Sequence, residues 1–129
     1  MRKICFIIVN RSNFARVKDL MVDINKDKSL KLQTIACSSS ILSKYGSVNK
    51  DMKKAGIKID YEVYSTVSGQ NLNSMSKSTG MLLLELSTIF NKLKPDIIVT
   101  IGDRFETIAT AITATVSYTH LTLPTKRIV

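Results

Sequence analysis

The sequence predicts an α/β fold, in which helices cover both faces of a parallel sheet. Short apolar runs alternate with segments of helical spacing, in the order strand, helix, strand, short helix, strand, long helix, strand, helix, and this alternation is typical of parallel sheets. The run at residues 97–101 is β-branched throughout, which suits a strand buried on both faces.

The first third of the chain contains two predicted strands, residues 3–9 and 30–37, joined by a helix. This helix is expected to begin at Asn13 or Phe14 and to end near Asn25. Its apolar residues recur at helical spacing and predict one buried face. They are Val17, Leu20, Met21 and Ile24.

The middle of the chain is predicted to contain short helices and a short strand. Residues 41–45 suggest a helical turn and residues 48–55 a short helix that ends at Gly56, a natural C-cap. Residues 57–63 alternate apolar and polar side chains, which predicts a third strand at or near an edge of the sheet.

A long helix is predicted over residues 74–92, before the strand at 97–101 and a last helix over 105–114. Its predicted buried side consists of Met75, Ser78, Thr79, Leu82, Leu86, Ile89, Phe90 and Leu93. Gly80 costs about 1 kcal/mol inside a helix relative to alanine. We interpret it as a position of close packing, in preference to close approach of a ligand.

Length and composition indicate one globular domain. The 129 residues carry a formal charge of +9, but the lysines are scattered and aromatic residues are few, so we expect no nucleic-acid partner. No apolar run reaches the roughly 20 residues needed to span a membrane, and the apolar N-terminus is interpreted as a first strand. Cys5 and Cys37 are interpreted as buried thiols in a reducing cytoplasm.

The last residues are predicted not to belong to the domain. Residues 116–125, VSYTHLTLPT, resemble the translation of a transposase adapter used in sequencing libraries. We therefore expect the native domain to occupy residues 1–115 and residues 116–129 to be a non-native tail. His120, the only histidine, falls in this tail and is given no role.

Two loops that follow strands carry the candidate site residues. Arg11 follows the first strand, and Asp103 and Arg104 follow the strand at 97–101. Ligands bind at the carboxyl edge of such sheets. Two arginines there are suited to bind a phosphate or pyrophosphate group, because guanidinium binds such oxygens in a bidentate way. Asp103 between them suits a catalytic or sugar-binding role. The alternative is that Asp103 caps the following helix and Arg104 lies in solvent.

Several cofactor motifs do not occur in the sequence. It contains no G-x-G-x-x-G for a dinucleotide, no G-x-x-x-x-G-K-[ST] P-loop and no G-x-S-x-G nucleophile elbow. Zinc-ligand spacing does not occur either. We expect neither a cofactor nor a metal.

Four features carry a family resemblance over nearly all residues before Val116. They are Asn10-Arg11, Tyr45-Gly46, Ser76-Lys77-Ser78-Thr79-Gly80, and Leu93-Lys94-Pro95-Asp96 leading into Gly102-Asp103-Arg104-Phe105-Glu106. The chain resembles the hydrolysing UDP-N-acetylglucosamine 2-epimerases. Arg104 favours the hydrolysing branch, because the non-hydrolysing relatives usually carry threonine there.

The resemblance implies the N-terminal, Rossmann-like half of a GT-B fold and a cytoplasmic enzyme acting on a UDP-sugar for sialic acid synthesis. The implied reaction eliminates UDP across C1–C2, and water then adds to the glycal to release the free 2-epimer. Asp103 matches a catalytic carboxylate, and Arg11 and Arg104 match positions that bind UDP or its phosphates. The parent is expected to form a homo-oligomer, and this fragment alone to be inactive.

Two departures from the family pattern leave the sugar open. Residues 11–14 read Arg-Ser-Asn-Phe where the family often has Arg-Ala-Asp-Tyr, and residues 38–41 read Ser-Ser-Ser-Ile where many members have Gly-x-His-Leu. A 2,4-diacetamido sugar is therefore an alternative to N-acetylglucosamine. The rival functions are a GT-B glycosyltransferase and a non-enzymatic nucleotide-binding module.

Overall fold

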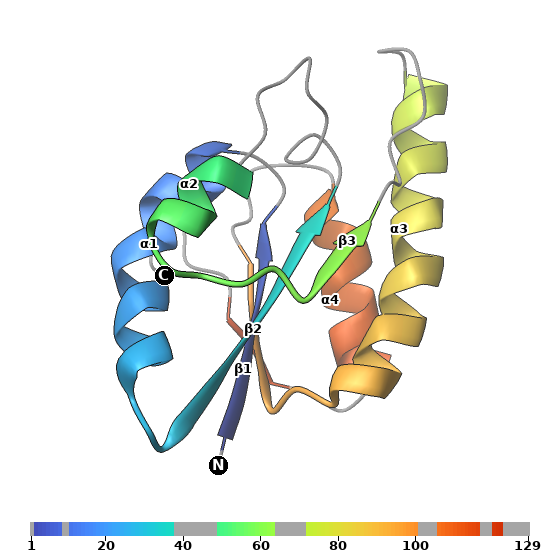
Figure 1. Ribbon diagram of the computed structural model, residues 1–129. Helices are drawn as coiled ribbons and strands as arrows, with labels where there is room; N and C mark the ends of the chain where they lie inside the picture. The colour runs from blue at the N-terminus through green and yellow to red at the C-terminus, as the bar shows by residue number, and fades with distance from the viewer. Residues whose placement is uncertain are drawn as a thin grey trace.

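The computed structural model describes residues 2–8, 11–37, 49–63, 72–100, 106–116 and 120–122. These residues form a five-stranded parallel sheet with helices on both faces (Figure 1). The elements are β1 (Arg2–Ile8), α1 (Arg11–Lys26), β2 (Leu30–Cys37), α2 (Asn49–Lys54), β3 (Tyr61–Val63), α3 (Leu72–Leu93), β4 (Ile97–Val99), α4 (Glu106–Val116) and β5 (His120–Thr122). The α/β alternation and the parallel sheet that the sequence predicts are confirmed.

The strand order is β3-β2-β1-β4-β5, so β1 lies at the centre of the sheet. Ile4 pairs with Leu32 of β2 on one side and with Ile97 of β4 on the other. The third strand lies at the edge, as predicted, although only its last three residues join the ladder.

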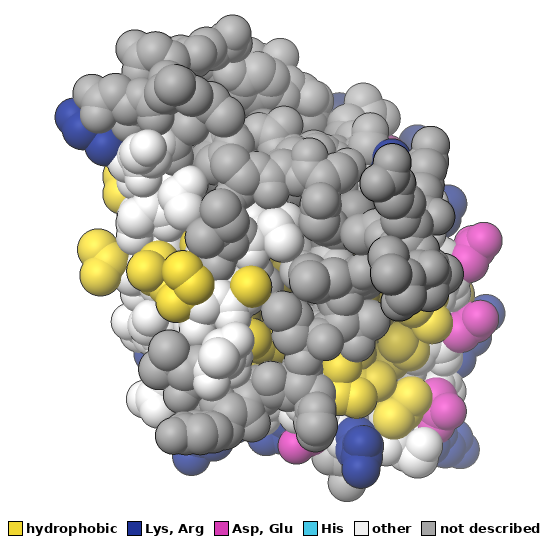
Figure 2. Space-filling view, turned by 180° about the vertical axis from the view of Figure 1, so that it is seen from behind, with side chains coloured by type: hydrophobic (Ala, Val, Ile, Leu, Met, Phe, Trp, Pro, Cys, Tyr) yellow, Lys and Arg dark blue, Asp and Glu magenta, His cyan; other side chains and the backbone are white. Residues whose placement is uncertain are grey.

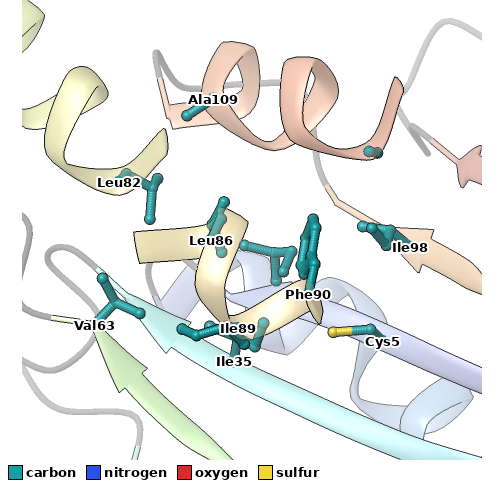
Figure 3. Close-up of a cluster of buried hydrophobic side chains, with 11 residues drawn as sticks. Cys5, Ile35, Val63, Leu82, Leu86, Ile89, Phe90, Ile98 and Ala109 are labelled. Atoms are coloured by element: carbon teal, nitrogen blue, oxygen red, sulfur yellow. The ribbon is translucent and has the colours of Figure 1, made fainter. Parts of the chain in front are cut away.

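Helices α3 and α4 cover one face of the sheet over an apolar core (Figure 3). Leu82, Leu86 and Phe90 of α3 share this buried cluster with Cys5 of β1 and Ile35 of β2. The predicted buried side of α3 is confirmed at Ser78, Leu82, Leu86, Ile89 and Phe90, and Thr79 and Leu93 are half-buried. Met75 is outside the described side chains.

Helices α1 and α2 cover the opposite face (Figure 1). Phe14, Val17, Met21 and Ile24 of α1 form its buried stripe, together with Met52 of α2. The prediction for Leu20 is wrong, because this side chain is 50% exposed. With 3.6 residues per turn, Leu20 falls on the flank of the helix away from Phe14, where the sheet no longer covers it.

The C-terminus of α2 confirms Gly56 as a cap. Gly56 has φ of 76°, in the left-handed region. Its amide donates to the Lys53 carbonyl at 3.1 Å, and the Ile57 amide donates to the Met52 carbonyl at 2.9 Å. This pair of bonds is the Schellman arrangement, and the apolar contact that accompanies it joins Met52 and Ile57 in one core.

Gly80 is not a position of close packing, so that interpretation is wrong. The residue is exposed, and a Cβ built there would meet none of the described atoms within 4 Å. Cys5 is a buried thiol, as expected. The Cys37 side chain and the predicted turn at residues 41–45 lie outside the described residues.

The fifth strand falls within residues 116–129. Ile97, Ile98 and Val99 of β4 pair in parallel with His120, Leu121 and Thr122. A ladder is made by backbone groups, so an extended segment of foreign sequence can form it as well as a native one. The boundary after residue 115 stays a prediction.

Candidate functional site at the carboxyl edge of β1 and β4

The carboxyl ends of β1 and β4 lie side by side. Phe6 of β1 pairs with Val99 at the end of β4. From β1 the chain crosses through α1 to β2, whereas from β4 it passes through α4 toward β5 on the other side. The two connections therefore diverge between β1 and β4. Such a switch point is where open α/β sheets bind ligands.

Two helices begin at this edge, one on each face of the sheet. α1 starts at Arg11 and contributes to the core on one face of the sheet. α4 starts at Glu106, and its Ala109 contributes to the core on the other face. The first amides of a helix have no partner within the helix and carry partial positive charge. α1 has no acidic residue in its first turn to occupy them, so the N-terminus of this helix favours an anion.

The structure places the predicted site residues as follows. Arg11 is the first residue of α1, and its side chain is not described. Asp103 and Arg104 fall within 101–105, outside the described residues, between Thr100 and the start of α4. The structure thus places the end of β1, which precedes Arg11, beside the end of β4, which precedes Asp103 and Arg104.

Buried polar side chains that the sequence analysis did not select lie next to these element ends. Asn13 in the first turn of α1 is fully buried, and Thr100 directly after β4 is 2% exposed. Thr110 in α4 is also buried. A signal for Asn13 was available, because it precedes Val17 by four residues and so shares the buried face of the helix.

The described part of the chain holds no group of three or more histidine, cysteine, aspartate or glutamate side chains that could bind a metal ion. None of the helices, in the ranges described, is long and apolar enough to cross a membrane.

Taken together, the parallel sheet, the switch point and the two helix N-termini define a Rossmann-like α/β domain, the N-terminal half of a GT-B fold. Residues 22–121 match the family described as UDP-N-acetylglucosamine 2-epimerase. Since this match covers most of the chain, the chain belongs to that family.

Individual relatives agree with this assignment. The chain is 31% identical over 110 residues to the GDP/UDP-N,N'-diacetylbacillosamine 2-epimerase (hydrolyzing) of Campylobacter jejuni, covering 85% of this chain and 28% of the relative. It is 23% identical over 124 residues to the UDP-N,N'-diacetylbacillosamine 2-epimerase (hydrolyzing) of Legionella pneumophila, covering 96% of this chain and 32% of the relative.

A similar solved structure is the UDP-GlcNAc 2-epimerase from Neisseria meningitidis bound to UDP-GlcNAc, with a TM-score of 0.75 and 16% identity. The match covers 92% of this chain and 31% of that structure. The chain thus spans about a third or less of the length of these relatives.

Proposed function

We propose that the chain is the N-terminal part of a hydrolysing 2-epimerase that converts UDP-N-acetylglucosamine, or a 2,4-diacetamido analogue, to the free 2-epimer sugar and UDP. The observation that carries this proposal is the family match together with two relatives named as hydrolyzing. Both of these relatives are named for N,N'-diacetylbacillosamine, which favours the diacetamido sugar.

In this proposal the diphosphate binds at the switch point. Arg11 and Arg104 neutralise it, since guanidinium groups bind phosphate oxygens in a bidentate way, and the first amides of α1 add to the positive field. Asp103 serves as one of the acid–base carboxylates for the elimination of UDP across C1–C2 and the addition of water. A group of this kind contributes roughly 10²–10⁴-fold to the rate.

The proposal also extends to the parent protein as a whole. The parent is cytoplasmic, forms a homo-oligomer and has neither nucleic acid nor membrane as a partner. The 129-residue chain alone is inactive, because the remaining catalytic groups and the uridine-binding half lie in the rest of the parent. Release of UDP by the purified 129-residue chain would contradict this.

The test uses the full-length parent with Arg11→Ala, Arg104→Ala and Asp103→Asn variants, and Lys18→Ala as the control for loss of an exposed cation on α1. The arginine variants are expected to weaken UDP binding by about tenfold or more, measured by calorimetry. Asp103→Asn is expected to bind UDP normally and to lose turnover, measured as UDP release and as the free sugar in NMR spectra. Unchanged UDP affinity in both arginine variants would overturn the assignment of the phosphate site.

A further inference from the structure

The positive charge of the chain is concentrated at the edge of the sheet opposite the candidate site. This amino edge comprises residues 2–3, 26–31, 53–60 and 92–96, where α1, α2 and α3 end and the chain enters the strands. Residues 1–115 contain 17 basic and 10 acidic residues. Ten of the basic and three of the acidic residues lie at the amino edge, which leaves seven of each in the remainder. The charge excess of residues 1–115 therefore lies at this edge alone.

The four ranges of the amino edge are far apart in the sequence but contact one another in the fold. Lys3 pairs with Lys31 across the sheet, and the Lys3 amide donates to Oδ2 of Asp96 at 2.8 Å. The Asn25 side-chain amide, at the end of α1, donates to the Gly56 carbonyl at 3.2 Å. Nine of the ten cations are exposed, and dark blue side chains recur along the lower border of the molecule in Figure 2, the border at which β1 begins in Figure 1. Cations that are scattered in the sequence thus form one surface.

Three of these cations occupy energetically unfavourable positions. Lys3 and Lys31 are register partners on neighbouring strands, so their side chains project from the same face of the sheet and their charges repel each other. Lys94 has φ of 48°, a left-handed conformation that glycine adopts without strain and lysine does not. Such unfavourable positions are found where a side chain has a role, and a bound anionic partner would relieve the repulsion.

We propose that the amino edge is the docking surface for an acidic protein, one that presents a patch of aspartate and glutamate side chains. Three carboxylates lie among the cations, and each accepts a hydrogen bond from a backbone amide: Asp27, Asp60 and Asp96. These negative charges interrupt the positive surface. They oppose the continuous negative charge of a nucleic-acid backbone or a lipid layer, whereas the separate charges of a protein surface can be arranged around them.

The composition of the amino edge also favours a protein over the other two classes of polyanion. Its four ranges contain no aromatic residue on which bases could stack. None of the large hydrophobic side chains that the structure shows as exposed lies in these ranges, so nothing there would insert into a membrane. A protein docked at this edge would leave the carboxyl edge, with the candidate site, open.

The test measures binding of labelled poly-L-glutamate to the full-length parent by fluorescence anisotropy at low ionic strength. The amino-edge variant Lys31→Glu/Lys94→Glu is expected to bind at least about tenfold more weakly than wild type. The matched control, Lys18→Glu/Lys50→Glu, reverses two exposed cations outside the amino edge and changes the net charge equally. It should weaken binding by less than about threefold. Circular dichroism and thermal unfolding check that both variants keep the fold.

Duplex DNA and vesicles of phosphatidylserine and phosphatidylcholine replace poly-L-glutamate in two further measurements. Any binding to them is expected to weaken equally in the two double variants, as attraction by net charge alone would. A loss confined to the amino-edge variant with DNA or vesicles would assign the edge to that class of partner and overturn the proposal. Equal losses of poly-L-glutamate binding in the two variants would overturn it too, as would a wild-type parent that does not bind poly-L-glutamate.

Discussion

Asp96 forms two hydrogen bonds with the backbone of Lys3. The Lys3 amide donates to Oδ2 of Asp96 at 2.8 Å, and the Asp96 amide donates to the Lys3 carbonyl at 2.9 Å. Asp60 binds Thr34 in the same way: the Thr34 amide donates to Asp60 Oδ2 at 2.8 Å, and the Asp60 amide donates to the Thr34 carbonyl at 2.9 Å. Each aspartate directly precedes a strand, so its carboxylate extends the ladder by one bond and helps to fix its register.

Loss of either carboxylate is expected to destabilise the fold. Asp60→Ala should cost about 1–2 kcal/mol, because the Thr34 amide is part-buried and loses its acceptor. Asp96→Ala should cost less, about 0.5–1 kcal/mol, because the bond to Lys3 is exposed and water replaces it. Urea unfolding measures both, with the exposed Asp23→Ala as the control for loss of charge. Equal stability of Asp60→Ala and Asp23→Ala would contradict the role of the carboxylate.

Two buried threonines are expected to respond oppositely to replacement by valine. The Thr34 hydroxyl has no partner among the described atoms, so Thr34→Val removes an unsatisfied polar group and should stabilise the fold by about 1 kcal/mol. The Thr113 hydroxyl donates to the Ala109 carbonyl at 2.8 Å, and Thr113→Val should cost about 0.5–1.5 kcal/mol. Thermal unfolding by calorimetry compares the two. A destabilised Thr34→Val variant would show that the hydroxyl has a partner.

The two glycines with described surroundings should also differ. Gly80→Ala places a methyl group in open space on a helix and should stabilise the fold by about 1 kcal/mol. Gly56→Ala forces a Cβ into the left-handed region, where φ is 76°, and should cost about 1–2 kcal/mol. Denaturant midpoints of both variants check this, and a loss of stability in Gly80→Ala would indicate a contact with that surface.

The turn after α1 should make stability depend on pH. The Ser29 hydroxyl donates to Oδ1 of Asp27 at 2.7 Å and the Ser29 amide donates to the same oxygen at 2.8 Å, which lowers the pKa of Asp27 below 3.8. Since the pKa is lower in the folded state, the contribution is present above pH 3.8 and is lost as the pH falls through the folded-state pKa. Asp27→Ala should therefore be less stable than wild type at neutral pH, and the difference should narrow in acid. Unfolding by urea at several pH values tests this, and a difference independent of pH would contradict it.

Helices and strands are predicted well where local sequence patterns determine them, and less well where contacts with residues distant in the sequence do. The strand at 30–37 and the cap at Gly56 follow from local patterns, and the structure has both. Residues 57–60 alternate like a strand but lie outside β3. Ile57 completes the α2 cap, and the side-chain carboxylate of Asp60, in place of a backbone carbonyl, accepts the bond from the Thr34 amide. Leu20 has helical spacing, but its exposure depends on where the sheet ends.

From the sequence, the candidate site could be located only to the carboxyl edge of the sheet. A strand followed by Arg11 and another followed by Asp103 predict that both loops lie at a carboxyl edge, and the pairing of β1 with β4 puts those edges together. The burial of Asn13 was not predicted, although its spacing of four residues from Val17 places it on the buried face of the helix. Its burial follows from the packing of α1 on the sheet.

The pairing of β1 with β4 also sets the order in which the chain can fold. Ile4 pairs with Leu32 and with Ile97, so the partner strand on one side of β1 is complete at Cys37, whereas the partner strand on the other side begins only at Ile97. Until then β1 carries an open, apolar edge, which is a template for aggregation. The paired edge of β1 and β4 therefore forms only after β4 has been made, and its formation requires closure of the long loop between the two strands.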